Sequence, residues 1–153
     1  MARKKHSSQL EDHAGYWLRY VSNHVSQAFA RKVEARGVTV AEWVLLRQML
    51  ESGITNPSLL AQSIGMTRGA VSKLVERVCQ KKLAIRAHSE LDRRFQTVEL
   101  TESGKQLVPI LAKLADQNDQ EFFGHMKAEE KTWLINILQD MVRRHGWKEL
   151  PVS

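Results

Sequence analysis

The chain has 153 residues, a formal net charge of +6 and a single cysteine. This length fits one domain, 1–153, whose core is large enough to fold without disulfides or a metal ion. No apolar run reaches the roughly 18 to 20 residues that span a bilayer, and the basic N-terminus is not followed by the apolar segment of a secretory signal. We therefore expect no membrane association and a cytoplasmic location, which the lone cysteine also fits.

The N-terminal third of the chain predicts two helices. A capping-box sequence begins at Ser8, and apolar residues recur at helical spacing beyond it, which predicts a long helix over about 8–35. A second capping-box sequence begins at Thr39. The apolar residues that follow it predict a short, mostly buried helix that ends at Gly53.

The next segment predicts two helices separated by a tight turn. Asn56 before Pro57 indicates the start of a short helix over about 57–63, and Thr67 caps a further helix that runs to about residue 82. In this second helix one apolar stripe faces the core and a polar, basic face lies opposite, because successive residues are rotated by about 100°. The stripe consists of Val71, Leu74, Val75 and Val78, and the opposite face of Gly69, Ser72, Lys73, Glu76, Arg77 and Gln80.

A predicted β-hairpin follows, in a region that carries most of the positive charge. Residues 83–88 and 95–100 predict two strands joined by a polar loop over 89–94. Residues 68–94 hold eight Lys and Arg against three acidic residues, a net charge of +5 in a chain whose total is +6. Such a concentration of positive charge is typical of a surface that binds the phosphate backbone of nucleic acid, because neutralised phosphates release counterions.

Two helices complete the predicted elements. One begins at Thr101, runs to about residue 123 and contains Pro109, which we expect to bend the helix or to shift its start because proline removes a helical hydrogen bond. The other, over about 128–145, ends at Gly146. Its apolar face is too wide for one neighbouring helix to cover, so we expect part of it to pack on a second copy of the chain.

The two central helices have the spacing of a helix-turn-helix, whose second helix fits the major groove of DNA. A basic helix face by itself is more often a solvated surface. The hairpin directly after it, with Asp92-Arg93-Arg94 in its loop, favours DNA binding instead. The expected fold class is mainly α with a small β-hairpin wing, a winged helix-turn-helix with further helices at both ends.

The order of elements, together with Thr67 to Val78, Asp92-Arg93-Arg94 and the segment Leu100-Thr101-Glu102-Ser103-Gly104, resembles the MarR (multiple antibiotic resistance regulator) family of bacterial winged-helix transcription factors. The resemblance covers nearly the full chain. It implies a DNA-binding winged lobe over 38–100 and dimerisation helices over 8–36 and 101–146.

The resemblance also implies a mode of action. It implies a homodimer that binds a pseudo-palindromic double-stranded DNA operator, represses transcription and is released by a ligand. By the same resemblance, Asp92 pairs with an arginine to orient the wing, and Arg94 enters the minor groove. Family members usually have glycine where this chain has Lys82, and often proline where it has Glu90.

Two groups of residues follow as candidate sites. The candidate DNA-binding residues are Thr67, Arg68, Gly69, Ser72, Lys73, Arg77, Asp92, Arg93 and Arg94. Trp17, Trp43 and Arg47 are candidates for binding a small aromatic acid effector, because an aromatic wall and a guanidinium suit an anionic phenolic compound. Such ligands lie between the dimer helices and the DNA-binding lobe in members of the family. The alternative is that both tryptophans belong to the core and that Arg47 is a surface charge.

Other classes of function have weaker support in the sequence. No catalytic motif is present, so we expect neither an enzyme nor a cofactor. The six histidines include no closely spaced pair, which argues against a metal site, and Cys79 at the edge of the apolar stripe is expected to be a buried, inert thiol. A metal- or thiol-responsive sensor of the same fold, and a winged-helix module for protein or RNA contacts, remain as alternatives.

Overall fold

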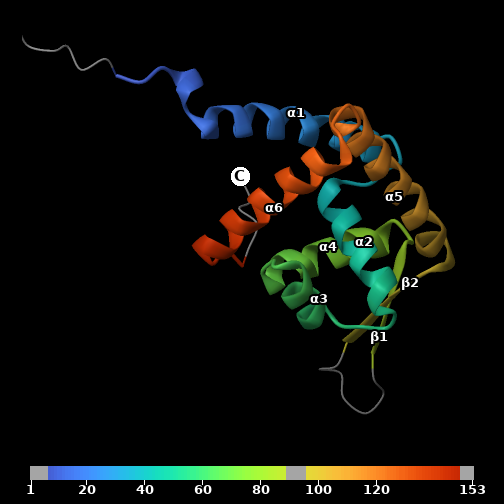
Figure 1. The fold of residues 1–153 in the computed structure, drawn as a ribbon. Coiled ribbons are helices and arrows are strands. Elements are labelled where there is room, and N and C mark those ends of the chain that lie inside the picture. The colour runs from blue at the N-terminus through green and yellow to red at the C-terminus, as the bar shows by residue number, and fades with distance from the viewer. Residues whose placement is uncertain (1–6, 89–95, 149–153) are drawn as a thin grey trace, which may run out of the picture.

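The structure, a computed structural model, describes residues 7–88 and 96–148. Within these ranges it contains helices and one two-stranded antiparallel sheet (Figure 1). The elements are a 3-10 turn Leu10–Asp12, α1 Ala14–Glu34, α2 Val40–Ser52, α3 Pro57–Ile64, α4 Arg68–Gln80, β1 Ala84–His88, β2 Gln96–Leu100, α5 Glu102–Phe123 and α6 Ala128–His145. None of these helices is both long and apolar enough to cross a membrane.

Four helices begin at the N-caps that the sequence predicts. The side chains of Thr39, Asn56, Thr67 and Thr101 each accept a hydrogen bond from the backbone nitrogen three residues later, at 2.9–3.2 Å. These bonds satisfy donors that have no partner in the first turn of a helix. The predicted starts of α2, α3, α4 and α5 are therefore confirmed.

The start of the first helix differs from the prediction. A separate 3-10 turn, Leu10–Asp12, comes first, and α1 begins at Ala14 and not at Ser8. Between them His13 has an extended backbone, with φ −100° and ψ 123°. Its Nδ1 atom lies 2.9 Å from the carbonyl oxygen of Gln9. This local bond between a side chain and the backbone competes with the helical hydrogen bonds and delays the start of α1.

Pro109 lies inside α5 without interrupting it. The helix runs from Glu102 to Phe123 with Thr101 as its N-cap, so Pro109 does not shift its start, and a bend stays a prediction. Proline cannot donate to the carbonyl of Lys105 one turn earlier. Both Lys105 and Pro109 are exposed, which puts the missing hydrogen bond on the solvent side of α5.

The hairpin is confirmed, and the loop before α3 adds to it. β1 and β2 pair antiparallel with Ala84 opposite Leu100. β1 begins one residue later than predicted, and the predicted start of the second strand, residue 95, lies outside the described residues. Thr55 forms an isolated bridge to Val98, with its backbone nitrogen and oxygen at 3.0 and 2.8 Å from their partners. No pattern in the sequence predicts this bridge, which connects the α2–α3 loop to the base of the hairpin.

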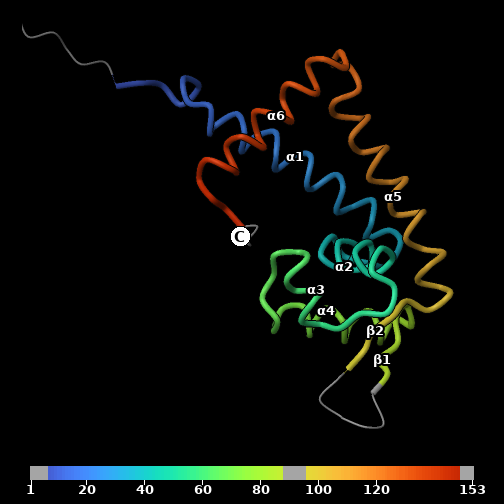
Figure 2. Tube along the Cα trace, turned by 60° about the horizontal axis from the view of Figure 1, so that its bottom comes forward, coloured from blue at the N-terminus to red at the C-terminus, as the bar shows by residue number. Residues whose placement is uncertain are grey.

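The core lies between the helices α1 to α5 and the hairpin. Its fully buried side chains come from α1, α2, α3, α4, β2 and α5, and include Val33, Leu45, Leu46, Met49, Leu60, Val71, Val75, Val78, Val98, Val108 and Leu111. Figures 1 and 2 show α5 running along one side of this lobe, while α1 and α6 lie at the end of the molecule away from the hairpin. By contrast, α6 has no buried residue.

Candidate nucleic-acid interface

The two central helices form a helix-turn-helix. Gly65 ends α3 in the left-handed conformation, with φ 67° and ψ 34°, which glycine adopts without steric cost. Two residues later Thr67 is the N-cap of α4. The chain therefore reverses direction in a short turn, and the predicted spacing of the two helices is confirmed.

The helix α4 divides into the two faces that its sequence predicts. Val71, Leu74, Val75 and Val78 are buried. The residues that α4 and its N-cap leave exposed are Thr67, Arg68, Gly69, Ser72, Lys73, Glu76, Arg77 and Gln80. All six of the predicted DNA-binding residues in this segment thus lie on one accessible surface. We call this surface the α4 face.

The cations of the α4 face form no ion pair in the described part of the chain. Arg68, Lys73 and Arg77 form no ion pair there, whereas Arg47 and Arg144, for example, are paired with carboxylates. A Cβ atom added at Gly69 would meet nothing within 4 Å, so packing does not demand a glycine at this position. The α4 face therefore offers three cations to an approaching anion, and Gly69 leaves the backbone of its first turn open.

Arg86 belongs to the same region, although the sequence analysis did not include it among the site residues. It lies on β1, and its Nη2 atom donates to the carbonyl oxygen of Ser72 at 3.4 Å. The period-two pattern of a strand places Arg86 on the same side as Ala84, which is buried. That alternation is the signal that could have identified Arg86 as a residue directed towards α4.

Cys79 has the environment of an unreactive thiol. It is half-buried and packs against the core cluster. Burial raises the pKa of the Cys79 thiol, and the opposing effect of the positive Arg86 is smaller. A raised pKa leaves less thiolate, which is the reactive form, at neutral pH.

Lys82 has a left-handed backbone with φ 59°. Among the described residues it is the one residue other than glycine with a positive φ. This conformation explains a preference for glycine, since a Cβ atom there crowds the following carbonyl. The three wing residues Asp92, Arg93 and Arg94 lie outside the described residues.

Two of the three candidate effector residues share one face of α2. Trp43 is partly buried, and its ring packs edge-on against that of Phe29 in α1 with centroids 6.5 Å apart. Arg47, one turn later, lies 3.0 Å from the carboxylate of Glu51 in a half-exposed ion pair. An aromatic ring and a guanidinium thus lie close to the junction of α1 and α2.

The third candidate, Trp17, is not near them within one chain. Its indole nitrogen donates to the carbonyl oxygen of Glu11 at 2.9 Å, and half of its surface is exposed. Phe29, which contacts Trp43, lies about 18 Å further along α1 at the usual helical rise. A site that contains both tryptophans therefore requires a second copy of the chain.

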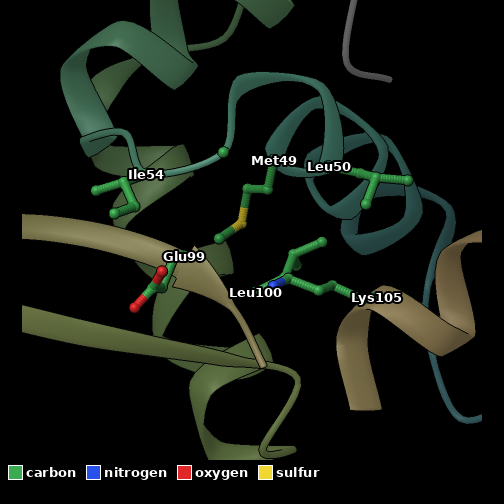
Figure 3. A pocket seen from close by; sticks show the side chains of 7 residues that line it. Met49, Leu50, Ile54, Glu99, Leu100 and Lys105 are labelled. Atoms are coloured by element: carbon green, nitrogen blue, oxygen red, sulfur yellow. The ribbon is translucent and has the colours of Figure 1, made fainter. Parts of the chain in front are cut away.

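A small hollow lies elsewhere on the lobe (Figure 3). Its volume is about 200 Å³, and it is lined by Met49, Leu50, Gly53, Ile54, Glu99, Leu100 and Lys105. This volume is below the range of about 300–1,000 Å³ typical of small-molecule sites. Neither Trp43 nor Arg47 lines it. Within 7–88 and 96–148, no three His, Cys, Asp or Glu residues are grouped so that they could hold a metal ion.

Comparisons with known proteins agree with this arrangement. The model of the MarR family matches residues 36–94. NicR, an HTH-type transcriptional repressor of Pseudomonas putida, is 24% identical over 133 residues, which are 87% of this chain and 84% of NicR.

Two solved structures share the fold. One is that of Bordetella bronchiseptica BpsR, whose DNA binding is regulated by 6-hydroxynicotinic acid, with a TM-score of 0.76 and 24% identity over 88% of this chain and 96% of BpsR. The other is the S. aureus MepR–DNA complex, with a TM-score of 0.76 and 24% identity over 86% of this chain and 98% of MepR. The chain is therefore similar to MarR-family regulators over residues 36–94, and it shares the fold of BpsR and MepR.

Proposed function

We propose that this regulator is a homodimeric repressor that binds a pseudo-palindromic DNA operator and is released by an aromatic acid. The winged lobe, 38–100, reads the DNA, with α4 as the recognition helix, and the segments 8–36 and 101–146 form the dimer. The single observation that carries the proposal is the α4 face, where exposed cations lie opposite a fully buried stripe. MepR, which has the same fold, forms a complex with DNA.

Exposed apolar side chains support the dimer. On α6, Trp133 is 69% exposed and Val142 is 45% exposed. On α1, Trp17 and Tyr20 are 50% and 55% exposed. Apolar surface of this extent along two helices is typical of a surface that another protein covers. Two identical chains joined there present two recognition helices, as a palindromic site requires.

The DNA assignment is tested by selection and substitution. We expect the wild-type protein to enrich one palindromic sequence from a random duplex library. Replacing Lys73 or Arg77 with alanine should then weaken binding to that sequence by about 1–3 kcal/mol where the side chain contacts a base. Binding is measured by fluorescence anisotropy at several salt concentrations, because loss of a phosphate contact lowers the salt dependence.

The matched control for these variants is Lys113→Ala. Lys113 is exposed on α5, so this change removes the same charge at a distance from α4. It should leave the affinity close to that of the wild type. Equal weakening by all three substitutions would show that net charge alone governs binding and would contradict the assignment to the α4 face.

For the effector we propose a small aromatic carboxylate held near Trp43 and Arg47. BpsR responds to 6-hydroxynicotinic acid, a compound of this class. In this chain the Arg47 guanidinium already binds the carboxylate of Glu51 on an exposed surface. An incoming carboxylate replaces that partner at little cost, since exposed ion pairs contribute at most about 1 kcal/mol.

The effector assignment is tested with salicylate and 6-hydroxynicotinate. Coupling of about 1–3 kcal/mol between the two sites would lower operator affinity about 5- to 150-fold at saturation. Arg47→Ala should abolish this response, and Glu51→Gln should strengthen it, because the competing carboxylate is gone. An equal response in both variants would place the effector elsewhere. Tryptophan fluorescence without DNA measures the binding step separately.

A further inference from the structure

The C-terminal turn of α4 is attached by a lysine side chain to the junction of α1 and α2. Lys81 is the C-cap of α4. Its Nζ atom donates to the carbonyl oxygen of Gly37 at 2.8 Å and to Oε2 of Glu42 at 2.7 Å. Gly37 precedes α2, and Glu42 is in its first turn. One ammonium group thus links the recognition helix to the segment between α1 and α2 and to the first turn of α2.

Glu42 gives this link its strength. The residue is 1% exposed, and its carboxylate also accepts a hydrogen bond from the backbone nitrogen of Thr39 at 3.0 Å. A buried carboxylate without a cation is strongly destabilising, so Glu42 needs a positively charged partner. Lys81 supplies it from the surface, since its side chain is 39% exposed. The position of Lys81 is therefore fixed by a group that cannot move into solvent.

The residues directly after α4 are attached to the start of α5 through their backbone carbonyl groups. Thr101, the N-cap of α5, donates its hydroxyl to the carbonyl oxygen of Lys82 at 2.7 Å, and its backbone nitrogen bonds to the carbonyl oxygen of Leu83 at 3.0 Å. The end of α4 is thus held between α2 and α5 (Figure 1). The side chain of Lys81 is the part of this joint that a substitution can remove while leaving the backbone intact.

We propose that Lys81 is a positioning residue for DNA recognition, which fixes the direction of α4 relative to the dimer helices by binding Glu42 and Gly37. The proposal rests on the proposed function as a dimeric DNA-binding protein. Two recognition helices must match two half-sites about one helical turn apart. If Lys81 sets their relative direction, it sets which half-site spacing the dimer accepts.

The test compares operators that differ only in the spacing of their half-sites. The probe is the duplex that the wild-type protein selects from a random library, together with versions lengthened or shortened by two base pairs. Each change rotates one half-site by roughly 70° about the DNA axis. We expect Lys81→Met to lose about tenfold or more of the wild-type preference for the selected spacing.

Lys82→Met is the matched control. It removes the same charge one residue later, and the Lys82 side chain forms no hydrogen bond with the described residues. It should leave the spacing preference unchanged. If Lys81 instead only attracts phosphates, Lys81→Met will weaken all spacings alike and reduce the salt dependence of binding by about one phosphate contact, which would overturn the proposal.

A double variant separates positioning from stability. Lys81→Met leaves the Glu42 carboxylate buried without its cation, whereas Lys81→Met combined with Glu42→Gln removes both charges, and the glutamine side chain can still accept from Thr39. This double variant should unfold near the wild-type temperature and still lack the spacing preference. A wild-type preference in the double variant would overturn the positioning role. If the wild-type protein enriches no duplex, the proposed function itself fails first, and the positioning role with it.

Discussion

At the scale of single residues, Lys82 occupies a backbone conformation that favours glycine. Its backbone has φ 59°, a conformation that glycine adopts freely and that costs other residues roughly 1 kcal/mol. Hydrogen bonds on both sides of Lys82 hold the backbone in this conformation. The Lys82 carbonyl accepts from Thr101, and the backbone nitrogen of Leu83 bonds to the carbonyl oxygen of Val78 at 2.9 Å.

We therefore expect Lys82→Gly to stabilise the protein by about 0.5–1 kcal/mol, because the left-handed conformation loses its steric penalty. Urea unfolding followed by circular dichroism measures the change. Lys82→Ala removes the same charge and keeps the Cβ atom, so it should bring no such gain. Equal stabilisation by both variants would mean that charge repulsion, and not backbone strain, limits stability at this position.

At the scale of elements, Gly104 permits the contact between α5 and the end of α4. A Cβ atom built on Gly104 would lie 2.1 Å from the carbonyl oxygen of Leu83 and 3.2 Å from Cδ2 of Leu100. The nearest obstacle is backbone, which cannot rotate away as a side chain can. The Leu-Thr-x-x-Gly segment thus combines an N-cap for α5 with the close approach of that helix to the turn after α4.

Gly104→Ala should destabilise the fold by roughly 2 kcal/mol or more, since relief requires the two elements to separate. Thermal and urea unfolding measure the loss. The control is Gly69→Ala, also in a helix, where a new Cβ atom meets nothing within 4 Å. That substitution should be neutral or stabilising by up to about 1 kcal/mol, as alanine favours helix over glycine. A loss of similar size at both positions would contradict the packing argument.

At the scale of the whole molecule, α6 has the surface of an interface, because its apolar face stays exposed among the residues that the structure describes. None of its residues is buried, although many of them are apolar. The exposed apolar side chains include Trp133, Ile137, Leu138, Met141 and Val142. Its contact with α5 includes an ion pair between Lys131 and Asp119 near its start. The helix is thus fixed at one end, and its apolar face remains available to a second copy of the chain.

Placing charge on this face should separate the proposed dimer without unfolding the chain. Leu138→Glu combined with Val142→Glu should give a monomer in analytical ultracentrifugation, because both residues are exposed in the single chain. Operator affinity should fall at least about 100-fold, since the second half-site no longer binds within the same complex. Asn136→Glu adds charge at another exposed position of α6 and should leave the dimer intact. A tight-binding monomer would contradict the dimer proposal.

Local chemistry in the sequence determined most of the elements and the two faces of α4. N-cap side chains act within three residues, and the spacing of Val71, Leu74, Val75 and Val78 alone defines a buried stripe. For the same reason the exposed polar residues of α4 were predictable one by one. The start of α1 was not, because the bond from His13 to the carbonyl of Gln9 competes with a capping signal that is equally local.

The tertiary structure decided which distant residues meet. The pairing of Lys81 with Glu42 and the bridge from Thr55 to Val98 join residues far apart in the chain. No periodicity or motif encodes such pairs, since they depend on how the packed helices fix the approach of one element to another. The separation of Trp17 from Trp43 within one chain has the same origin, because it follows from the length of a straight α1 and from where α2 packs on it.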